Sequence, residues 1–176
     1  MDVVELGFVK KTASWKLRSK FFPSKIGGKP SWLSLKNLPE PSELICKTCS
    51  NPLVFLLQVY ANIDDRDDTF HRTIYVFMCS RGKCIKRFSN DNFVVFRSQL
   101  PRKNEFYSFD PPEMSEKLSN IPSAEKFQDL CDVCGCKAIM SCEKCSKRNY
   151  CSDIHKNKDW DRTHKEDCNT GKFFLS

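Results

Sequence analysis

The chain has 176 residues, with 29 Lys or Arg against 22 Asp or Glu, so its formal charge is +7. This length suits one domain or two small ones. No apolar run approaches the roughly 18 residues of a membrane span, and the N-terminal MDVVELGFVKK lacks the basic and apolar regions of a secretion signal. We therefore expect neither a membrane span nor export.

The first 40 residues predict a strand at residues 3–9, then a Gly-rich turn, SKIGGKPSWL, that feeds a core strand. They are also basic, with eight Lys or Arg against three acidic residues. Such a face can contact RNA or an acidic partner, but most such faces are simply solvated. Nucleic acid is therefore not expected as the main partner.

Three later stretches have strand length and are rich in β-branched and aromatic residues, namely 53–60, 70–78 and 93–100. The polar sequence ANIDDRDDT between the first two predicts an antiparallel hairpin. Residues 110–130 are polar and contain prolines, which indicates a linker, and a cysteine-dense module follows at 131–168 with a tail at 169–176. We predict an α+β protein, with a β-rich domain over residues 1–109.

The eleven cysteines would suit a secreted disulfide scaffold, but their number is odd and no export signal precedes them. Paired cysteines then indicate zinc ligands. One pair, CKTC, precedes the first hairpin strand and the other follows the second. Because a hairpin returns the chain to its start, the pairs must lie side by side, as in a tetrahedral zinc site. The predicted ligands are Cys46, Cys49, Cys79 and Cys84.

Two alternative roles for these four cysteines have less support. They could be ordinary buried thiols, but that would leave their pairing across the hairpin without a cause. A redox C-x-x-C is normally surrounded by a βαβ pattern, which is missing here. A zinc ion that binds all four cysteines at the base of the hairpin explains their pairing without any further assumption.

From Cys131 to Cys168 the spacing is C-x₂-C-x₇-C-x₂-C-x₅-C-x₃-H-x₈-H-x₃-C, which is eight ligands for two more zinc sites. The last four lie on an expected helix that Ser152 can cap, as two pairs with ligands four residues apart. Nine residues separate the histidines, and at about 100° each this leaves the pairs half a turn apart. In a continuous helix the pairs cannot share an ion, so each must recruit its own C-x₂-C from upstream.

This pattern resembles the MYND zinc finger, a cross-brace finger with a C-terminal helix. The resemblance implies one ion at Cys131, Cys134, Cys151 and His155, and another at Cys142, Cys145, His164 and Cys168. Cys136 fits no ligand position, and His71 has no partner at ligand spacing, so both are expected to be structural. With ten thiolates and three Zn²⁺ ions, the charge of +7 falls to about +3.

A second likeness covers the whole chain. The segments ELGFV, WKLRSKFFPSKIGGKPSWL, LICKTCSNPLVFLLQVYA, FHRTIYVFMC and FRSQLPRKNEFYSF, followed by a MYND finger, resemble the N-terminal half of the programmed cell death protein 2 family over roughly residues 4–169. The resemblance implies a chaperone or escort of a small-subunit ribosomal protein in ribosome biogenesis, in nucleus and cytoplasm. Family members usually continue into a second domain, whereas this sequence ends at CNTGKFFLS. Whether this half acts alone is left open.

The expected client surface lies on the β-rich domain, at Trp32, the strands around Phe55 and Phe77, and the motif FRSQLPRKNEFYSF. The alternative function is a nuclear adaptor whose finger binds proline-containing peptides of transcriptional regulators. Trp160, with Tyr150 nearby, could line such a site, or it could pack against His164. Both roles of Trp160 are left open.

No enzymatic activity is expected. Closed zinc sites with four protein ligands leave no position for an activated water. The sequence also shows no Ser/His/Asp arrangement, nucleophile elbow or phosphate loop. RNA binding through residues 10–29, KCIKRF or PRK is a further alternative, which a steep salt dependence would reveal.

Overall fold

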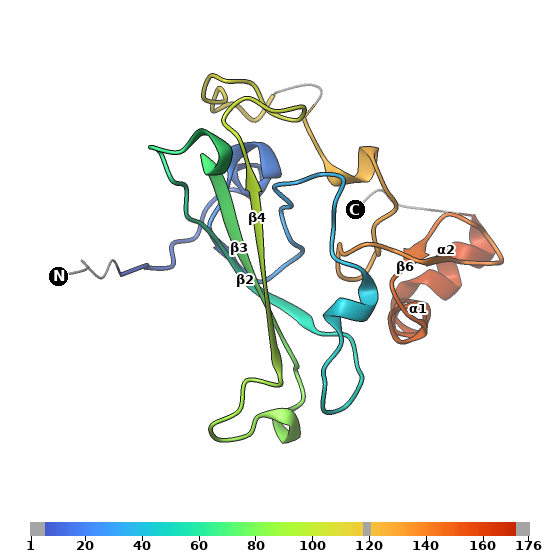
Figure 1. Ribbon diagram of the computed structural model, residues 1–176. Coiled ribbons are helices and arrows are strands. Elements are labelled where there is room, and N and C mark those ends of the chain that lie inside the picture. The colour runs from blue at the N-terminus through green and yellow to red at the C-terminus, as the bar shows by residue number, and fades with distance from the viewer. Residues whose placement is uncertain (1–5, 118–120, 172–176) are drawn as a thin grey trace.

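The computed structural model describes residues 6–117 and 121–171 (Figure 1). An antiparallel sheet in the order β1-β2-β3-β4 lies on one side of the molecule, and the helices of the cysteine-dense module lie on the other. Its strands are β1 (Lys25–Ile26), β2 (Val54–Tyr60), β3 (His71–Met78) and β4 (Phe93–Leu100). A second sheet pairs β5 (Met140–Ser141) with β6 (Asn149–Tyr150). The mixed α+β class is therefore as predicted.

Helical structure is concentrated at the C-terminus. It consists of α1 (Asp153–Asp159), a π-helix (Trp160–His164) and α2 (Lys165–Thr170) in direct succession. Short 3₁₀ helices lie at Ser14–Leu17, Ser19–Phe21, Pro41–Leu44, Asp67–Thr69, Gly82–Cys84 and Ala124–Lys126. No helix in the described ranges is long and apolar enough to cross a membrane.

The predicted hairpin is confirmed, since β2 and β3 pair antiparallel from Val54–Met78 to Tyr60–Thr73. The strand predicted from residue 93 is β4, which pairs with β3 along its whole length. The strand predicted at residues 3–9 is wrong for Leu6–Val9, which form no strand, while residues 3–5 lie outside the described part of the chain. Leu6 and Phe8 remain 75% and 87% exposed, so no packing stabilises an extended strand there.

Polar side chains of the sheet and of Tyr107, which follows β4, hold an irregular segment, Ser31–Leu33, against the inner face of the sheet. The side-chain oxygen of Gln58 accepts the N–H of Ser31 at 2.8 Å, and the hydroxyl of Tyr75 accepts the N–H of Leu33 at 2.7 Å. The hydroxyl of Tyr107 donates to the carbonyl of Leu33 at 2.8 Å. Because a segment outside a sheet has no ladder partners, these side chains satisfy backbone groups that burial would otherwise leave unpaired.

This arrangement buries the aromatic residues that we expected at a client surface. Trp32 and Phe55 are each 4% exposed and Phe77 is fully buried. The Trp32 ring packs 4.9 Å from that of Tyr75 and 6.2 Å from that of Phe77. The structure corrects the expectation for these three residues, because the segment after Pro30 folds over the inner face of the sheet and makes them its core.

The β-rich domain and the cysteine-dense module share this core. Cys136 of the module and Ala124 both pack into it. The indole N–H of Trp32 donates to the carbonyl of Gly135 at 2.8 Å, and Lys137 forms an ion pair with Glu40. Residues within the predicted linker thus also pack on the β-rich domain, although the domain boundaries themselves stay a prediction.

Gly135 is the tightest point of this contact. Its φ of +70° lies in the left-handed region, and a Cβ at this position would lie 2.8 Å from the Cβ of Lys29. A side chain here would therefore be strained by its backbone and would also push the two parts of the molecule apart.

We predict that Gly135→Ala destabilises the protein more than Gly27→Ala does. Gly27 has a similar φ of +71° but nothing within 4 Å of a built Cβ, so Ala there costs only the left-handed strain, about 1–2 kcal/mol. The clash with Lys29 should add roughly 1–3 kcal/mol to the loss at Gly135. Denaturant unfolding of both variants measures the difference, and equal losses would mean that the contact at Gly135 is not close.

Candidate metal centres

The twelve cysteines and histidines that the spacing singles out come together in three sets of four. Within each set the ligand atoms all lie within 4.8 Å of one another. The sets are Cys46, Cys49, Cys79 and Cys84; Cys131, Cys134, Cys151 and His155; and Cys142, Cys145, His164 and Cys168. These are the groupings expected from the hairpin and from the interleaved finger.

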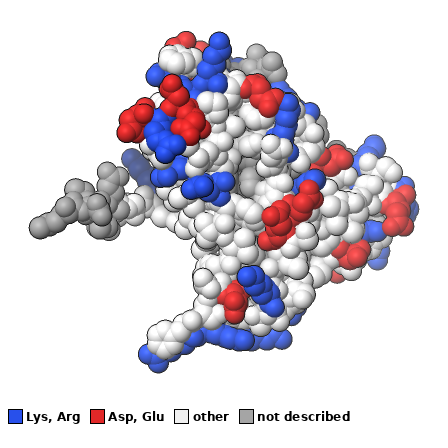
Figure 2. All heavy atoms as spheres, viewed as in Figure 1, with Lys and Arg blue, Asp and Glu red and all other residues white. Residues whose placement is uncertain are grey.

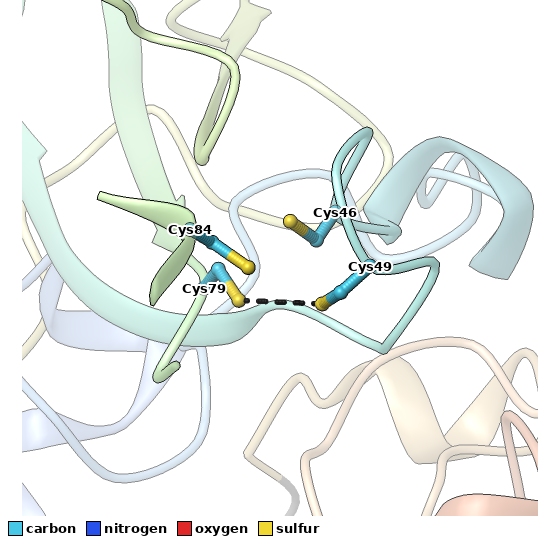
Figure 3. Close-up of side chains that lie close together, drawn as sticks. All are labelled: Cys46, Cys49, Cys79 and Cys84. Carbon is cyan, nitrogen blue, oxygen red and sulfur yellow. Dashed lines mark hydrogen bonds between the residues drawn. The ribbon is translucent and has the colours of Figure 1, made fainter. Parts of the chain in front are cut away.

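The first set lies at the base of the hairpin, where Figure 3 shows four side chains pointing toward one another. Cys46 and Cys49 come from the turn before β2, while Cys79 follows β3 directly. The sulfurs of Cys49 and Cys79 are 3.7 Å apart. Two sulfurs bound to a tetrahedral zinc at about 2.3 Å would be roughly 3.8 Å apart, so this set fits the ion.

The second set joins a turn to the first turn of α1. The sulfurs of Cys134 and Cys151 are 3.7 Å apart, and the sulfur of Cys131 lies 3.6 Å from Nδ1 of His155. A sulfur and a nitrogen on one tetrahedral zinc would be about 3.6 Å apart, which the distance from Cys131 matches, while the sulfur of Cys151 lies closer to Nδ1, at 3.1 Å. His155 therefore presents Nδ1 to the site.

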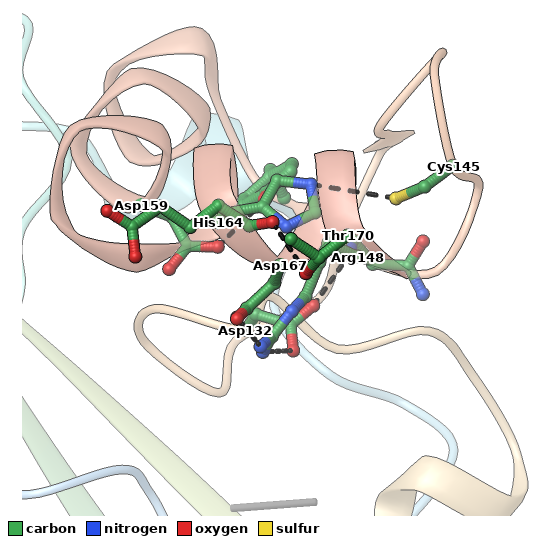
Figure 4. A network of polar contacts seen from close by, with 10 residues as sticks. Asp132, Cys145, Arg148, Asp159, His164, Asp167 and Thr170 are labelled. Carbon is green, nitrogen blue, oxygen red and sulfur yellow. Dashed lines mark hydrogen bonds and ion pairs between the residues drawn. The ribbon is translucent and has the colours of Figure 1, made fainter. Parts of the chain in front are cut away.

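The third set joins the neighbouring turn to the π-helix and α2. Figure 4 shows the sulfur of Cys145 facing the ring of His164, and its distance to Nε2 is 3.6 Å. This again matches the separation of a sulfur and a nitrogen on one zinc ion, roughly 3.6 Å. The two histidines of the finger thus use different ring nitrogens. Spacing alone did not reveal this difference.

All three C-x₂-C turns have the same backbone geometry. In each, the residue after the second cysteine has a positive φ, and its N–H donates to the carbonyl of the first cysteine at 2.7–2.8 Å. The donors are Ser50, Gly135 and Ser146, and the acceptors are Cys46, Cys131 and Cys142. This turn directs backbone N–H groups at the first sulfur.

The backbone N–H groups that point at the first sulfur of each turn stabilise its thiolate, which is the form that zinc binds. For Cys46, burial raises the pKa, but the N–H groups of Cys49 and Thr48 and the neighbouring thiols outweigh it and lower the pKa to about 7. Burial likewise raises the pKa of Cys142, and the ring of His164 and nearby N–H groups lower it to about 6. The pKa of Cys84 and that of Cys168, in the same two sets, are raised, chiefly by burial, so one thiol in each of these sets loses its proton more readily than the others.

Arg148 connects the two sites of the finger and was missed from the sequence. Its guanidinium donates to Asp132 at 3.0 Å and lies 3.5 Å from the carboxylate of Asp167 (Figure 4). Asp132 follows the ligand Cys131, and Asp167 precedes the ligand Cys168. The sequence did show that Asp132 and Asp167 are charged residues next to ligands. Their pairing with Arg148, however, depends on how the turn folds.

The helix that carries the last ligands differs from the uniform α-helix that we assumed. Ser152 caps it as predicted, since its hydroxyl accepts the N–H of His155 at 3.3 Å. However, residues Trp160–His164 are π-helical. A π-helix turns less per residue than an α-helix, so the two ligand pairs are less than half a turn apart. They still reach different ions, as the three sets show.

The remaining candidates lie outside these sets. The Trp160 ring packs edge-on against that of His164 at 5.8 Å, which favours the supporting role over the peptide-binding one. Cys136 is buried in the shared core and belongs to none of the three sets. His71 begins β3, at the opposite end of that strand from Cys79.

We predict interleaved ligation in the finger. Cys131→Ser and Cys151→Ser should each remove the same ion, and Cys142→Ser and Cys168→Ser the other, because the sets cross in sequence. Cadmium-113 NMR of the substituted protein identifies which resonance each variant loses, with Cys136→Ser as the control that keeps all three. Loss of one common resonance from Cys131→Ser and Cys142→Ser would contradict this pairing.

We also predict that strong chelation unfolds residues 131–168 while part of the sheet persists. The buried cluster of the finger consists of ligands and Tyr150, whereas the sheet has an apolar core with Trp32 and Phe77. A finger without metal has little else to hold it. NMR spectra before and after chelation test this, and surviving dispersed signals from the finger would contradict it.

Comparisons with known proteins agree with this architecture. A family model described as programmed cell death protein 2, N-terminal domain, matches residues 3–114, and a MYND finger model matches residues 131–168. The MYND finger is a zinc-binding domain that mediates protein–protein interaction. No solved structure matches the chain.

The curated relatives give the same result. Programmed cell death protein 2 of Mus musculus and that of Rattus norvegicus are each 46% identical over 168 residues, covering 94% of this chain and 48% of the relative. Programmed cell death protein 2-like of Mus musculus is 33% identical over 111 residues, covering 63% of this chain and 29% of the relative. The chain spans about half the length of the curated relatives it matches. It belongs to the programmed cell death protein 2 family.

Proposed function

We propose that this chain is a non-enzymatic protein-binding module that escorts a newly made small-subunit ribosomal protein during ribosome biogenesis, in nucleus and cytoplasm. Family membership and the MYND finger support protein binding in general. The choice of client rests on the family resemblance. The observation that carries the proposal is an apolar surface on the sheet.

The outer sheet face, defined as the side of β1–β4 away from Trp32, carries exposed apolar side chains in its part nearer the hairpin metal site, while the pairs of Ile74 with Arg97 and of Arg72 with Gln99 make its other end more polar. One row of paired residues crosses all four strands, through Ile26, Leu57, Val76 and Val95. Ile26 and Val95, at the two edges, are 59% and 60% exposed. A solvated antiparallel sheet normally carries polar residues on its outer side, so this row indicates a covered surface in the working protein.

Neighbouring rows extend the apolar surface along the strands. Val54, Met78 and Phe93 form a row toward the hairpin metal site, and Val54 is 47% exposed. Val59 and Ile74 continue it toward the other end, where Arg97 faces the same side. A client with an apolar segment could bury these side chains, and such contact tolerates salt because apolar burial is not screened.

Charge makes a smaller contribution to this contact. Ribosomal proteins are basic, and with its metals the chain remains at about +3. The loop joining β2 to β3 contains four aspartates and one arginine, namely Asp64, Asp65, Arg66, Asp67 and Asp68. Figure 2 shows acidic and basic side chains gathered at its upper left. This loop could steer a basic client toward the sheet, while the apolar rows supply most of the affinity.

The alternative, a nuclear adaptor that binds proline-containing peptides through the finger, depends on Trp160. Its ring already packs on the ligand His164, so a bound peptide would compete with that contact. The outer sheet face needs no such rearrangement. Peptide binding by the finger is therefore the second candidate and an outcome of the test below.

We predict that Val76→Glu with Val95→Glu reduces recovery of the client at least tenfold, because paired carboxylates interrupt the central apolar row. The measurement is a pull-down from nuclease-treated lysate, quantified by mass spectrometry. One small-subunit ribosomal protein should be enriched over its neighbours. One control is Ile154→Glu, which changes an exposed apolar position on α1. The other is the double substitution Val76→Thr with Val95→Thr.

Zinc content should be unchanged in every variant, and each variant should remain folded at the assay temperature, although the facing glutamates lower the unfolding midpoint of the sheet variant. Loss of binding from Ile154→Glu but not from the sheet variant would favour the adaptor. Recovery of whole ribosomal subunits, or only of partners that nuclease removes, would contradict the escort function.

A further inference from the structure

A second candidate surface lies on the other side of the sheet, at the end opposite the hairpin metal site. It is a cavity of about 340 Å³, here called the aromatic pocket. Seven rings line it, and they belong to Phe22, Tyr60, Phe70, His71, Phe106, Tyr107 and Phe109. This volume is at the lower end of the range for ligand pockets, roughly 300–1,000 Å³. It suits one aromatic side chain with a short piece of backbone.

The pocket contains a strained residue. Phe22 has a φ of +48° and a ψ of +53°, which is left-handed backbone that bulky residues rarely adopt. Its ring stacks on His71 at 4.4 Å and on Tyr60 at 5.3 Å, and meets Tyr107 edge-on at 4.9 Å. Backbone strain of this kind persists only when surrounding contacts impose it, and it clusters at ligand sites.

The pocket also contains a buried polar atom without a partner. His71 is 5% exposed, and its Nδ1 lies 2.9 Å from the hydroxyl of Tyr60. Its Nε2 makes no hydrogen bond of regular geometry to the part of the chain that the structure describes, and the backbone of Arg102 is the neighbouring group that comes nearest to being a partner. If the Tyr60 hydroxyl donates to Nδ1, then Nε2 carries the ring proton and can donate. A buried donor of this kind requires a physical cause, and a ligand acceptor supplies one.

The charged groups at the pocket are mainly cationic. The guanidinium of Arg102 lies over the ring of Phe70 at 5.0 Å and over that of Phe109 at 3.9 Å. Lys20 also lines the pocket, and Asp110 is its single acidic lining residue. Neither Lys20 nor Arg102 forms an ion pair with a described residue. Two cations without an ion-pair partner beside stacked rings favour a ligand with both a ring and a negative charge.

We propose that the aromatic pocket binds an acidic peptide segment of a partner protein, with an aromatic side chain between the rings and a neighbouring carboxylate on Arg102 and Lys20. A backbone carbonyl or hydroxyl of the peptide accepts from Nε2 of His71. A nucleotide would also offer a ring and negative charge, so its competition with the peptide is one outcome of the test below. The acidic partner is distinct from the basic client of the outer sheet face.

The test uses the zinc-loaded chain and a fluorescein-labelled peptide, acetyl-Gly-Asp-Phe-Glu-Gly-Lys(fluorescein)-amide. Because fluorescein itself carries rings and negative charge, affinities are measured from fluorescence anisotropy by competition with unlabelled peptides, namely the same sequence, one with Ala for Phe and one with Lys for both acidic residues. We expect each change to weaken binding at least tenfold. Equal affinity of the Ala peptide, or no saturable binding up to millimolar protein, would overturn the proposal.

Protein variants locate the site. Arg102→Glu and Lys20→Glu should each weaken binding of the Phe peptide at least tenfold. Lys103→Glu is the matched control, because Lys103 is exposed and next to Arg102 but does not line the pocket. If Lys103→Glu weakened binding equally, the peptide would be held by nonspecific attraction between charges, and the proposed binding in the pocket would be wrong.

Two further measurements separate this proposal from its rivals. The Val76→Glu with Val95→Glu variant should bind the Phe peptide normally, so failure of the client function leaves this result intact. Displacement of the peptide by tetrauridylate at a lower concentration than by unlabelled peptide would overturn the proposal in favour of nucleic acid.

Discussion

Tetrahedral zinc ligation is the constraint on which the rest of this structure depends. Each centre draws four side chains to within 4.8 Å from two places far apart in sequence. At the base of the hairpin, zinc joins the turn before β2 to the segment after β3. In the finger, each ion joins one C-x₂-C turn to the C-terminal helical segment. The finger has few apolar side chains to bury, so metal ligation replaces a hydrophobic core there.

Ligation alone does not place the finger on the sheet. That depends on Trp32, whose ring belongs to the core of the sheet and whose indole N–H reaches the carbonyl of Gly135 at 2.8 Å. Gly135 also closes the first zinc turn of the finger, so one glycine serves the metal site and the contact between the two parts. Arg148 adds a second connection, between the turn at Asp132 and the helix at Asp167. The finger and its metal sites are therefore attached to the sheet by direct contacts.

The surfaces left free after this packing differ in character. The outer sheet face is apolar, because Val76 and Val95 point away from the core while Tyr75 and Phe77 fill it. The aromatic pocket, at the far end of β3 from Cys79, combines rings with two cations. The finger presents a helix whose Trp160 supports a ligand. The outer sheet face and the aromatic pocket are the separate sites that we propose for a client and for an acidic partner.

The metal ligands, the hairpin and the third strand could all be predicted from the sequence, because ligand spacing and strand patterning are local properties. Spacing also indicated that the last two ligand pairs belong to different ions, although the π-helix at Trp160–His164 altered the angle between them. Which aromatic residues are buried became evident only in the folded chain. Trp32, Phe55 and Phe77 are aromatic residues of the kind found at binding surfaces. However, the irregular segment after Pro30 carries Trp32 onto the inner face of the sheet, where it packs with the other two and all three are buried. Leu6–Val9 have a strand pattern but form no strand among the described residues. Burial and pairing depend on contacts between distant segments, and local sequence does not record those contacts.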